Sequence, residues 1–302
     1  MNETRPVDRV GTFSEQRPLL FSIAYRMLGS VMDAEDMVQE TFLRWQGAPA
    51  DDVRSPKSYL STVITRLCID QLRSARAQRE QYIGPWLPEP LITEETAQID
   101  EHLALADSLS MAFLVLLERL SPLERAAFLL REVFDYPYPE IARIVDKSEA
   151  NCRQMVHRAR EHISAGESRY EITPEQLREI SARFVQATSN GDMAGLIELL
   201  SDDVTVWSDG GGKVPAALNP IYGPAKVARY FIGVTRKMPP GTQMRTVRVN
   251  GRPGIIMWID RAVYMVAEVS FRDGKIDGMR VVRNPDKLRH VPQGPTTGPL
   301  SS

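Results

Sequence analysis

Apolar side chains recur at helical spacing through the first 80 residues. A first predicted helix begins near Glu15 and ends at Gly29-Ser30, a second is capped by Asp33 and covers 34–45, and a third covers 56–79. The positions expected to face the core are Leu19, Leu20, Ile23, Ala24, Met27 and Leu28, then Ala34, Val38, Phe42 and Trp45, then Leu60, Val63, Ile64, Leu67 and Leu72. Residues 1–13 show no such pattern. The spacing predicts a helical bundle with one buried side on each helix.

The second helix carries an acidic face opposite its apolar stripe. This face comprises Asp36, Gln39, Glu40 and Leu43, so it ends in an apolar side chain that is expected to be exposed. Two interpretations stay open from the pattern alone. The face is either an ordinary solvated helix surface or a docking surface for a basic helical partner.

The third helix combines an aromatic side chain with a series of cations on its outer side. These residues are Tyr59, Arg66, Arg73, Arg76 and Arg79. Cations attract backbone phosphates and an aromatic ring can stack on an unpaired base, so the combination suits nucleic acid. Without further context the signal is weak.

A second helical segment begins at Ser121-Pro122-Leu123-Glu124, which has the residues of a capping box. A short apolar-periodic segment covers 138–145, a polar turn covers 146–148, and a further helix is predicted over 149–162. Two short helices joined by a tight turn predict a helix-turn-helix, the motif that places its second helix in the DNA major groove.

The last of these helices separates its apolar and polar residues clearly. Its predicted buried stripe is Cys152, Val156, Ala159 and Ile163, and its polar faces carry Asn151, Arg153, Gln154, His157, Arg158 and Arg160. Arg, Asn and Gln can donate paired hydrogen bonds to base edges, so these faces favour DNA binding. Arg158 and Arg160 are the expected phosphate contacts. The alternative is a solvated face on a helical hairpin.

The chain has 302 residues and a formal net charge of −2, but the charge is unevenly distributed. No Lys or Arg occurs over 80–118, which separates two basic segments by an acidic connector. Three prolines over 85–90 favour an extended strut in this connector. Its Trp86 and leucines form either an exposed apolar hook or a segment packed on a neighbouring helix.

Cys68 and Cys152 fall on predicted apolar helix faces, which favours small buried side chains over a disulfide or a metal site. The sequence shows no signal peptide and no apolar run of the roughly 20 residues that a membrane span needs. A reduced, cytoplasmic setting and no cofactor are therefore expected.

The pattern changes after residue 165. A capping box at 173–176 opens a predicted helix that stops at Asn190-Gly191, and helices to Leu200 and over 223–237 follow. Strands are predicted over 204–207, 243–249, 255–259, 262–271 and 275–282. Helices followed by an antiparallel meander predict an α+β domain with a curved sheet. Residues 291–302 are rich in Gly, Pro, Ser and Thr and are expected to form a disordered tail.

The order of these elements resembles the extracytoplasmic-function (ECF) sigma factors of bacterial RNA polymerase over residues 14–165. The segments that carry the resemblance are the acidic helix at 33–42, the basic helix ending at 70–73, the start of the second helical segment at 120–125 and the helix-turn-helix end at 157–161. The resemblance implies region 2 over 14–80, a linker over 81–106 and region 4 over 107–165. Met155 stands where family members often carry arginine.

The resemblance also implies roles for individual residues. Asp36, Gln39, Glu40 and Leu43 would bind core RNA polymerase at the β′ clamp coiled coil, and the β subunit would be a second contact. Tyr59, Arg66, Arg73 and Arg76 would lie at the −10 element. The polar faces of the helix over 149–162 would read the −35 element of promoter DNA.

The third domain, over 173–288, resembles the SnoaL-like (NTF2-like) cone, and three motifs are similar to those of one class of ECF sigma factors. They are Trp86, Leu87, Pro88, Glu89 and Pro90 in the linker, Asp209, Gly210, Gly211, Gly212 and Lys213 in the cone, and Asn284, Pro285, Asp286, Lys287 and Leu288 after the last strand. The resemblance implies a cone that contacts the linker and regulates the sigma domains within one chain. A tail would cover 289–302.

Other functions remain open in the sequence. A stand-alone helix-turn-helix regulator with a ligand-sensing cone is the main alternative to a sigma factor, and a small-molecule ligand of the cone stays possible on either view. An enzyme is not expected, because no histidine lies between Gly166 and Arg289 to serve as a general base. Asp209, Tyr222, Tyr230 and Asp260 are the remaining polar candidates. The 209–213 segment lacks the spacing of a phosphate-binding loop, and its glycines are expected to permit close backbone approach.

Overall fold

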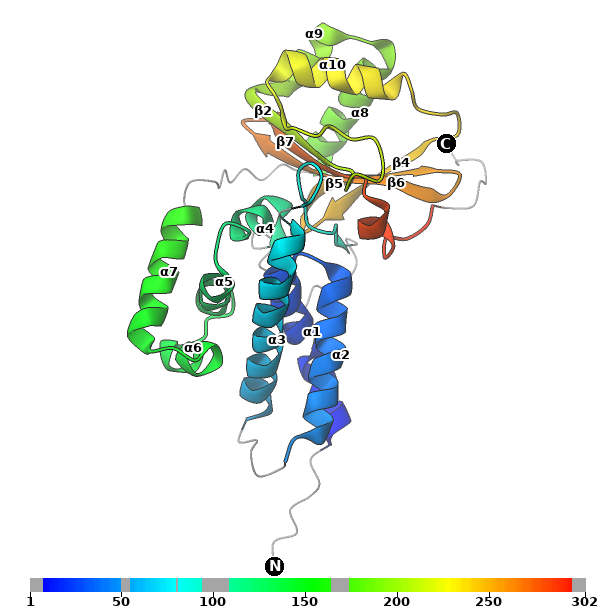
Figure 1. The fold of residues 1–302 in the computed structure, drawn as a ribbon. Helices are drawn as coiled ribbons and strands as arrows, with labels where there is room; N and C mark the ends of the chain where they lie inside the picture. The colour runs from blue at the N-terminus through cyan, green and yellow to red at the C-terminus, as the bar shows by residue number, and fades with distance from the viewer. Residues whose placement is uncertain (1–7, 50–54, 80, 94–108, 164–173, 295–302) are drawn as a thin grey trace, which may run out of the picture. The chain divides into compact units, whose positions relative to one another are not determined.

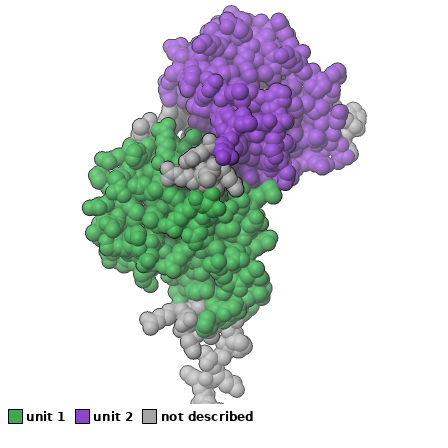
Figure 2. Space-filling model, viewed as in Figure 1, with its two compact units in different colours: residues 1–80, 98–166 green, residues 81–97, 167–302 purple. Residues whose placement is uncertain are grey.

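A computed structural model describes residues 8–49, 55–79, 81–93, 109–163 and 174–294 (Figure 1). Side chains of 75–79, 93, 174, 175 and 178 are also outside the description. The chain divides into two compact units (Figure 2). Unit 1 comprises 1–80 and 98–166, and unit 2 comprises 81–97 and 167–302. The two predicted sigma domains therefore form one unit, and the first part of the linker belongs with the cone.

Unit 1 begins with three helices that pack together, α1 (Arg9–Leu28), α2 (Val31–Gly47) and α3 (Pro56–Arg79). Gly29 ends α1 in a left-handed conformation with φ 67°, which only glycine adopts at little cost. The predicted core positions Leu20, Ala34 and Leu60 are fully buried. The predicted bundle is thus confirmed.

Two boundaries of these helices differ from the prediction. The first helix begins at Arg9, because the Asp8 side chain accepts a hydrogen bond from Gly11 N at 2.9 Å and caps the helix. The second helix is capped by Ser30, whose Oγ accepts from Asp33 N, so Asp33 lies inside the helix. In each case the capping residue lies before the first residue of the apolar pattern. The pattern therefore did not identify where the helix begins.

The second half of unit 1 contains α4 (Met111–Leu117), α5 (Pro122–Phe128), the π-helical turn η3 (Leu129–Val133), α6 (Tyr138–Val145) and α7 (Glu149–Ile163). Both hydrogen bonds of the predicted capping box form. The Ser121 side chain accepts from the backbone N–H of Glu124, and the Glu124 side chain accepts from the backbone N–H of Ser121. Asp146 ends α6 with φ 54° and starts the turn into α7. The predicted helix-turn-helix is therefore confirmed.

Unit 2 contains three helices and a curved sheet (Figure 1). The helices are α8 (Pro174–Asn190), α9 (Met193–Leu199) and α10 (Pro224–Thr235). The strands are β1 (Ile92–Thr93), β2 (Leu200–Asp209), β3 (Ile221–Tyr222), β4 (Gln243–Val249), β5 (Arg252–Ile259), β6 (Ala262–Arg272) and β7 (Lys275–Val282). The short 3-10 helix η4 (Pro285–Leu288) follows.

The sheet has the order β1-β4-β5-β6-β7-β2-β3. Strands β4 to β7 form the predicted antiparallel meander, and β2 joins it in parallel with β7. Val204 and Val206 of β2 pack with Val227 of α10 and Val281 of β7 in one buried cluster. The helices thus cover one face of the sheet, as the predicted α+β cone requires.

Two chain segments outside the cone pack on it, and the first of them adds a strand to the sheet. The linker supplies β1, in which Ile92 pairs with Val249 of β4. After η4, Val291 is buried, and Trp258 Nε1 donates to Pro292 O at 3.0 Å. Residues 289–294 therefore pack on the domain, which corrects the predicted disordered tail for these positions; 295–302 lie outside the described residues.

Candidate functional surfaces

The acidic face of α2 lies on its exposed side. Asp36 and Gln39 are exposed, Glu40 is half-buried and pairs with Arg44 at 2.8 Å, and Leu43 is 62% exposed. Met32, one turn before Asp36, is also 44% exposed, which sequence reasoning missed. Met32, Asp36, Gln39 and Leu43 follow helical spacing, so α2 presents a polar stripe that carries Asp36 and has an apolar side chain at each end.

The predicted −10 residues on α3 do not share one environment. The Tyr59 ring is half-buried and lies 5.8 Å from the Trp45 ring between centroids, and Arg73 is exposed beside Asp70. Arg66 donates from Nε to Ile144 O and from Nη2 to Arg143 O, both at 2.9 Å. The Arg76 side chain lies outside the described residues.

Arg66 belongs to a close contact between the two halves of unit 1. Its guanidinium caps the carbonyl end of α6, and Arg125 of α5 donates in turn to Met27 O at the end of α1, at 2.6 Å. Arg125 also pairs with Glu118 at 2.7 Å, and burial lowers its pKa. Each half therefore supplies a guanidinium that satisfies helix-end carbonyls of the other half.

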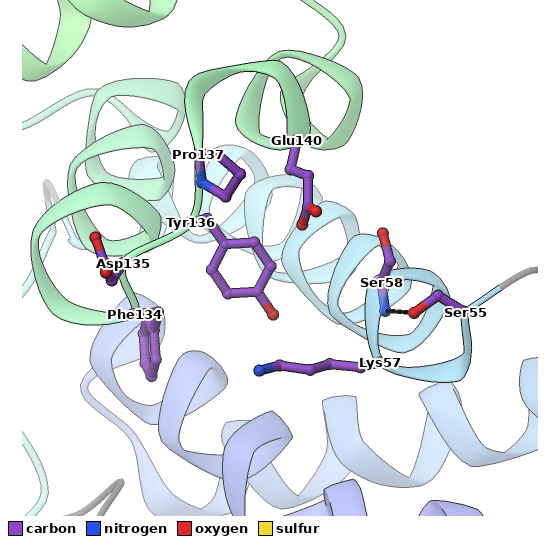
Figure 3. Close-up of a pocket in the computed structure, with 8 residues that line it drawn as sticks. All are labelled: Ser55, Lys57, Ser58, Phe134, Asp135, Tyr136, Pro137 and Glu140. Atoms are coloured by element: carbon purple, nitrogen blue, oxygen red, sulfur yellow. Dashed lines mark hydrogen bonds between the residues drawn. The ribbon is translucent and has the colours of Figure 1, made fainter.

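A small pocket lies along the same contact, between the start of α3 and the turn from η3 to α6 (Figure 3). It has a volume of about 250 Å³. Lys57, Phe134 and Tyr136 point toward it (Figure 3). The Tyr136 hydroxyl is 2.7 Å from Ser61 Oγ. The volume is below the roughly 300 Å³ of pockets that bury drug-sized ligands.

The six predicted −35 residues of α7 are all exposed. They are Asn151, Arg153, Gln154, His157, Arg158 and Arg160. The predicted stripe of Cys152, Val156 and Ala159 is fully buried. Met155, which stands where family members often carry arginine, is buried too, at 7% exposure. It therefore faces the core and is not part of the exposed face of α7.

Several of these side chains already bind carboxylates of unit 1. Arg158 Nε pairs with Glu124 at 3.0 Å, and Arg160 donates two hydrogen bonds to Glu132, at 3.2 and 2.8 Å. Partial burial acts to raise the pKa of Glu124, but hydrogen bonds from Ser121 and Arg158 bring it below its ordinary value. The cations of α7 are thus held in place at an exposed surface.

In unit 2 the three sequence motifs meet around one buried carboxylate, Asp209. Lys287 Nζ donates to Asp209 Oδ2 at 2.7 Å and to Leu87 O at 2.5 Å. Leu87 N donates to the same Oδ2 at 2.9 Å. The ion pair is desolvated, since the Asp209 and Lys287 side chains are 0% and 9% exposed. We call this set of contacts the linker clamp.

Aromatic rings from the linker complete the clamp. Lys287 Nζ lies 4.3 Å from the Trp86 ring and 4.9 Å from the Tyr82 ring. The Tyr82 hydroxyl donates to Asp209 Oδ1 at 2.5 Å and accepts from Asn284 Nδ2 at 2.9 Å. Burial and the hydrogen bond to Asp209 both raise the pKa of Tyr82. Tyr82 lies outside the predicted motif, and sequence reasoning missed it.

Of the two interpretations of the linker, the exposed hook is wrong, and the segment packs on the cone and not on a neighbouring helix. Leu87, Pro88, Glu89 and Pro90 are buried, and Trp86 is half-buried. The glycines fulfil their expected role at Gly211, which has φ 59° and lies against Asn284 and Tyr82 where a Cβ would collide. Lys213 pairs with Asp286 at the exposed rim and, as the main cause, lowers the pKa of Asp286.

The polar candidates for catalysis are separated. Asp209 is bound to Lys287 in the linker clamp, Tyr222 is 62% exposed on β3, and Asp260 lies in the turn before β6. Tyr230 packs beside Phe231 with ring centroids 5.2 Å apart. Within the described ranges no three His, Cys, Asp or Glu side chains are grouped to hold a metal ion. Of the helices described, none is both long and apolar enough to span a membrane.

Comparison with known proteins agrees with this architecture. Residues 12–78 match the Sigma-70 region 2 family, and residues 110–163 match the Sigma-70 region 4 family. The ECF RNA polymerase sigma factor SigJ of Mycobacterium tuberculosis is 36% identical over 94% of this chain and 94% of its own length. The probable ECF sigma factor SigI of the same species is 33% identical over 95% of this chain and 97% of its own.

The same relation is visible in three dimensions. The crystal structure of Mycobacterium tuberculosis SigJ superposes with a TM-score of 0.73 at 34% identity, covering 92% of this chain and 98% of that one. Two helical modules followed by a SnoaL-like cone define a transcription factor with an appended domain. This chain belongs to the extracytoplasmic-function sigma factors, a family that binds RNA polymerase and promoter DNA.

Proposed function

We propose that this sigma factor binds the β′ clamp coiled coil of core RNA polymerase through the exposed stripe of α2. The stripe contains the carboxylate of Asp36, the amide of Gln39 and the exposed side chain of Leu43. Glu40 lies beside them. Opposite charge steers a basic helical partner toward such a surface, and apolar ends add buried area on binding. We add Met32 to this surface because it is exposed on the same stripe.

The promoter contacts divide between two helices of unit 1. Exposed Asn151, Arg153 and Gln154 near the start of α7 suit base edges of the −35 element, and Arg158 and Arg160 suit phosphates. On α3, Tyr59, Arg66, Arg73 and Arg76 are assigned to the −10 element. Arg66 would have to leave the carbonyls of α6 to reach DNA, so −10 binding and the contact between the two halves of unit 1 are alternatives for this side chain.

The cone is proposed to regulate initiation by holding the linker. The observation that carries this proposal is the buried Asp209–Lys287 pair, which binds both the amide and the carbonyl of Leu87. Clamping 81–93 shortens the free connection between region 2 and region 4. The cone thereby limits how far the two promoter-reading modules can separate.

A polymerase-binding experiment tests the docking surface. We expect the double variant Asp36→Lys, Glu40→Lys to bind purified core polymerase on the order of 100-fold more weakly, because like charges would then face the basic partner. Glu15→Lys, at an exposed position of α1, is the matched control and should bind as the unmodified chain does. Unchanged binding of the double variant would show that α2 is not the docking surface.

A further inference from the structure

Tyr138 begins α6, and its half-buried ring lies beside the guanidinium group of Arg153 on α7. The Arg153 Cζ is 4.7 Å from the ring centroid, within the roughly 6 Å of a cation–π contact. Arg153 Nη2 also donates to Glu149 Oε2, one turn earlier on α7, at 3.3 Å. Two neighbours from different helices therefore hold this arginine.

The ring of Tyr138 is itself fixed. Pro137 and Pro139 flank it, and each restricts the backbone at the start of α6. A second guanidinium, that of Arg131, lies 5.4 Å from the same ring and donates to Tyr136 O at 3.2 Å. The ring is thus placed by local backbone and by a neighbouring cation.

Arg153 combines an aromatic contact with a carboxylate contact. Arg158 and Arg160, like Arg153, use N–H groups to bind carboxylates, those of Glu124 and Glu132, but the face of Arg153 also lies on the Tyr138 ring. An aromatic ring interacts with the planar face of a guanidinium, which leaves N–H groups at its edge for other acceptors. Arg153 remains 57% exposed, so a ligand can approach it.

We propose that Tyr138 is a positioning residue, which orders Arg153 to read a guanine of the −35 element through O6 and N7. Paired N–H groups of an arginine edge match these two acceptors, and this is the commonest specific contact in the major groove. An arginine that is ordered before binding loses less rotamer freedom on binding. The inference rests on the proposed role of α7 and adds to it a residue outside the recognition helix.

The test uses the full-length chain bound to core RNA polymerase and a library of promoter duplexes randomised over the −35 element. Bound DNA is sequenced to obtain a base preference at each position. Arg153→Lys should reduce the guanine preference at one position roughly 10-fold, since lysine lacks the paired donors. Tyr138→Leu should reduce it about 3-fold at the same position, and Tyr138→Phe should retain it because the ring remains.

Several outcomes would overturn the inference, and they are distinguishable. If the unmodified holoenzyme selects no −35 sequence, the proposed role of α7 fails and the inference fails with it. If it selects a sequence but Tyr138→Leu weakens all positions equally, or Tyr138→Phe behaves like Tyr138→Leu, only the inference fails. Thermal unfolding is measured for each variant, and base preferences are compared only among variants that are folded at the temperature of the binding experiment.

Discussion

The α7 surface and the linker clamp both contain ion pairs, but the two differ in exposure. Arg158 and Arg160 are more than half exposed, whereas Lys287 is 9% and Asp209 0% exposed. Exposed pairs contribute about 0–1 kcal/mol, so their partners can be exchanged for DNA phosphates at little cost. A buried pair cannot lose one partner without leaving a desolvated charge. This difference suits the roles proposed above, in which α7 exchanges its carboxylate partners for DNA and the linker clamp stays closed.

The largest expected effect follows from breaking the buried pair. Lys287→Met leaves Asp209 buried without its cation, and removing one partner of such a pair typically costs about 3–5 kcal/mol. We expect chemical denaturation to show a loss of that size in unit 2, and hydrogen exchange to show reduced protection over 81–93.

The exposed pair of the same motifs supplies the matched control. Lys213 and Asp286 are 52% and 38% exposed, so Lys213→Met should cost less than about 1 kcal/mol. Equal losses in the two lysine variants would contradict the distinction between buried and exposed pairs.

A smaller loss is expected at Tyr82. Tyr82→Phe removes the hydroxyl that donates to Asp209 and accepts from Asn284 but keeps the ring beside Lys287. A hydrogen bond to a charged group contributes about 1.5–3 kcal/mol, so denaturation should show a loss of about 2 kcal/mol. A loss below about 0.5 kcal/mol would mean that the hydroxyl is not a structural donor.

The raised pKa of Tyr82 also predicts the pH dependence of the clamp. The folded protein retains this proton above the ordinary tyrosine pKa of about 10, where the unfolded chain releases it. Stability should therefore fall as the pH rises above about 10. Tyr82→Phe should lack this part of the decline when unfolding is measured between pH 9 and 11, and an identical decline in both chains would contradict it.

The smallest effect on stability is expected at the exposed ion pair between η3 and α7. Glu132→Gln removes the charge that binds Arg160 and should change stability by less than about 1 kcal/mol. With Arg160 released from the carboxylate, the affinity of the holoenzyme for promoter DNA should increase, and its dependence on salt concentration should steepen. Weaker DNA binding would mean that Glu132 positions Arg160 for DNA and does not compete with it.

Much of this architecture was accessible from local pattern. Apolar spacing identified the buried side of α7, and the residues around Ser121 and Glu124 identified a cap that is formed entirely within one helix turn. The three short motifs were identified by resemblance, and the structure brings Leu87, Asp209 and Lys287 together. Each motif is a run of a few residues and is visible in the sequence, but the contacts among the three motifs span 78 to 200 residues and come from the structure.

The remaining features depend on partners distant in sequence. Strand β1 has two residues and exists because Ile92 pairs with Val249, and no local pattern marks it. Tyr82 joins the clamp through Asp209, which is 127 residues away. The contact of Arg125 with Met27 O spans 98 residues, so neither sequence segment indicates that the two halves of unit 1 meet.

The proposal that the cone regulates initiation through the linker clamp is tested most directly by run-off transcription. Purified core polymerase would be combined with the unmodified chain, with Lys287→Met or with Lys213→Met on a library of promoter fragments. We predict that Lys287→Met changes the yield of specific transcripts by at least about fivefold, the lower range of typical coupling between sites, whereas Lys213→Met does not. Identical transcription by all three chains, with the Lys287→Met clamp shown to be open by hydrogen exchange, would contradict the proposal.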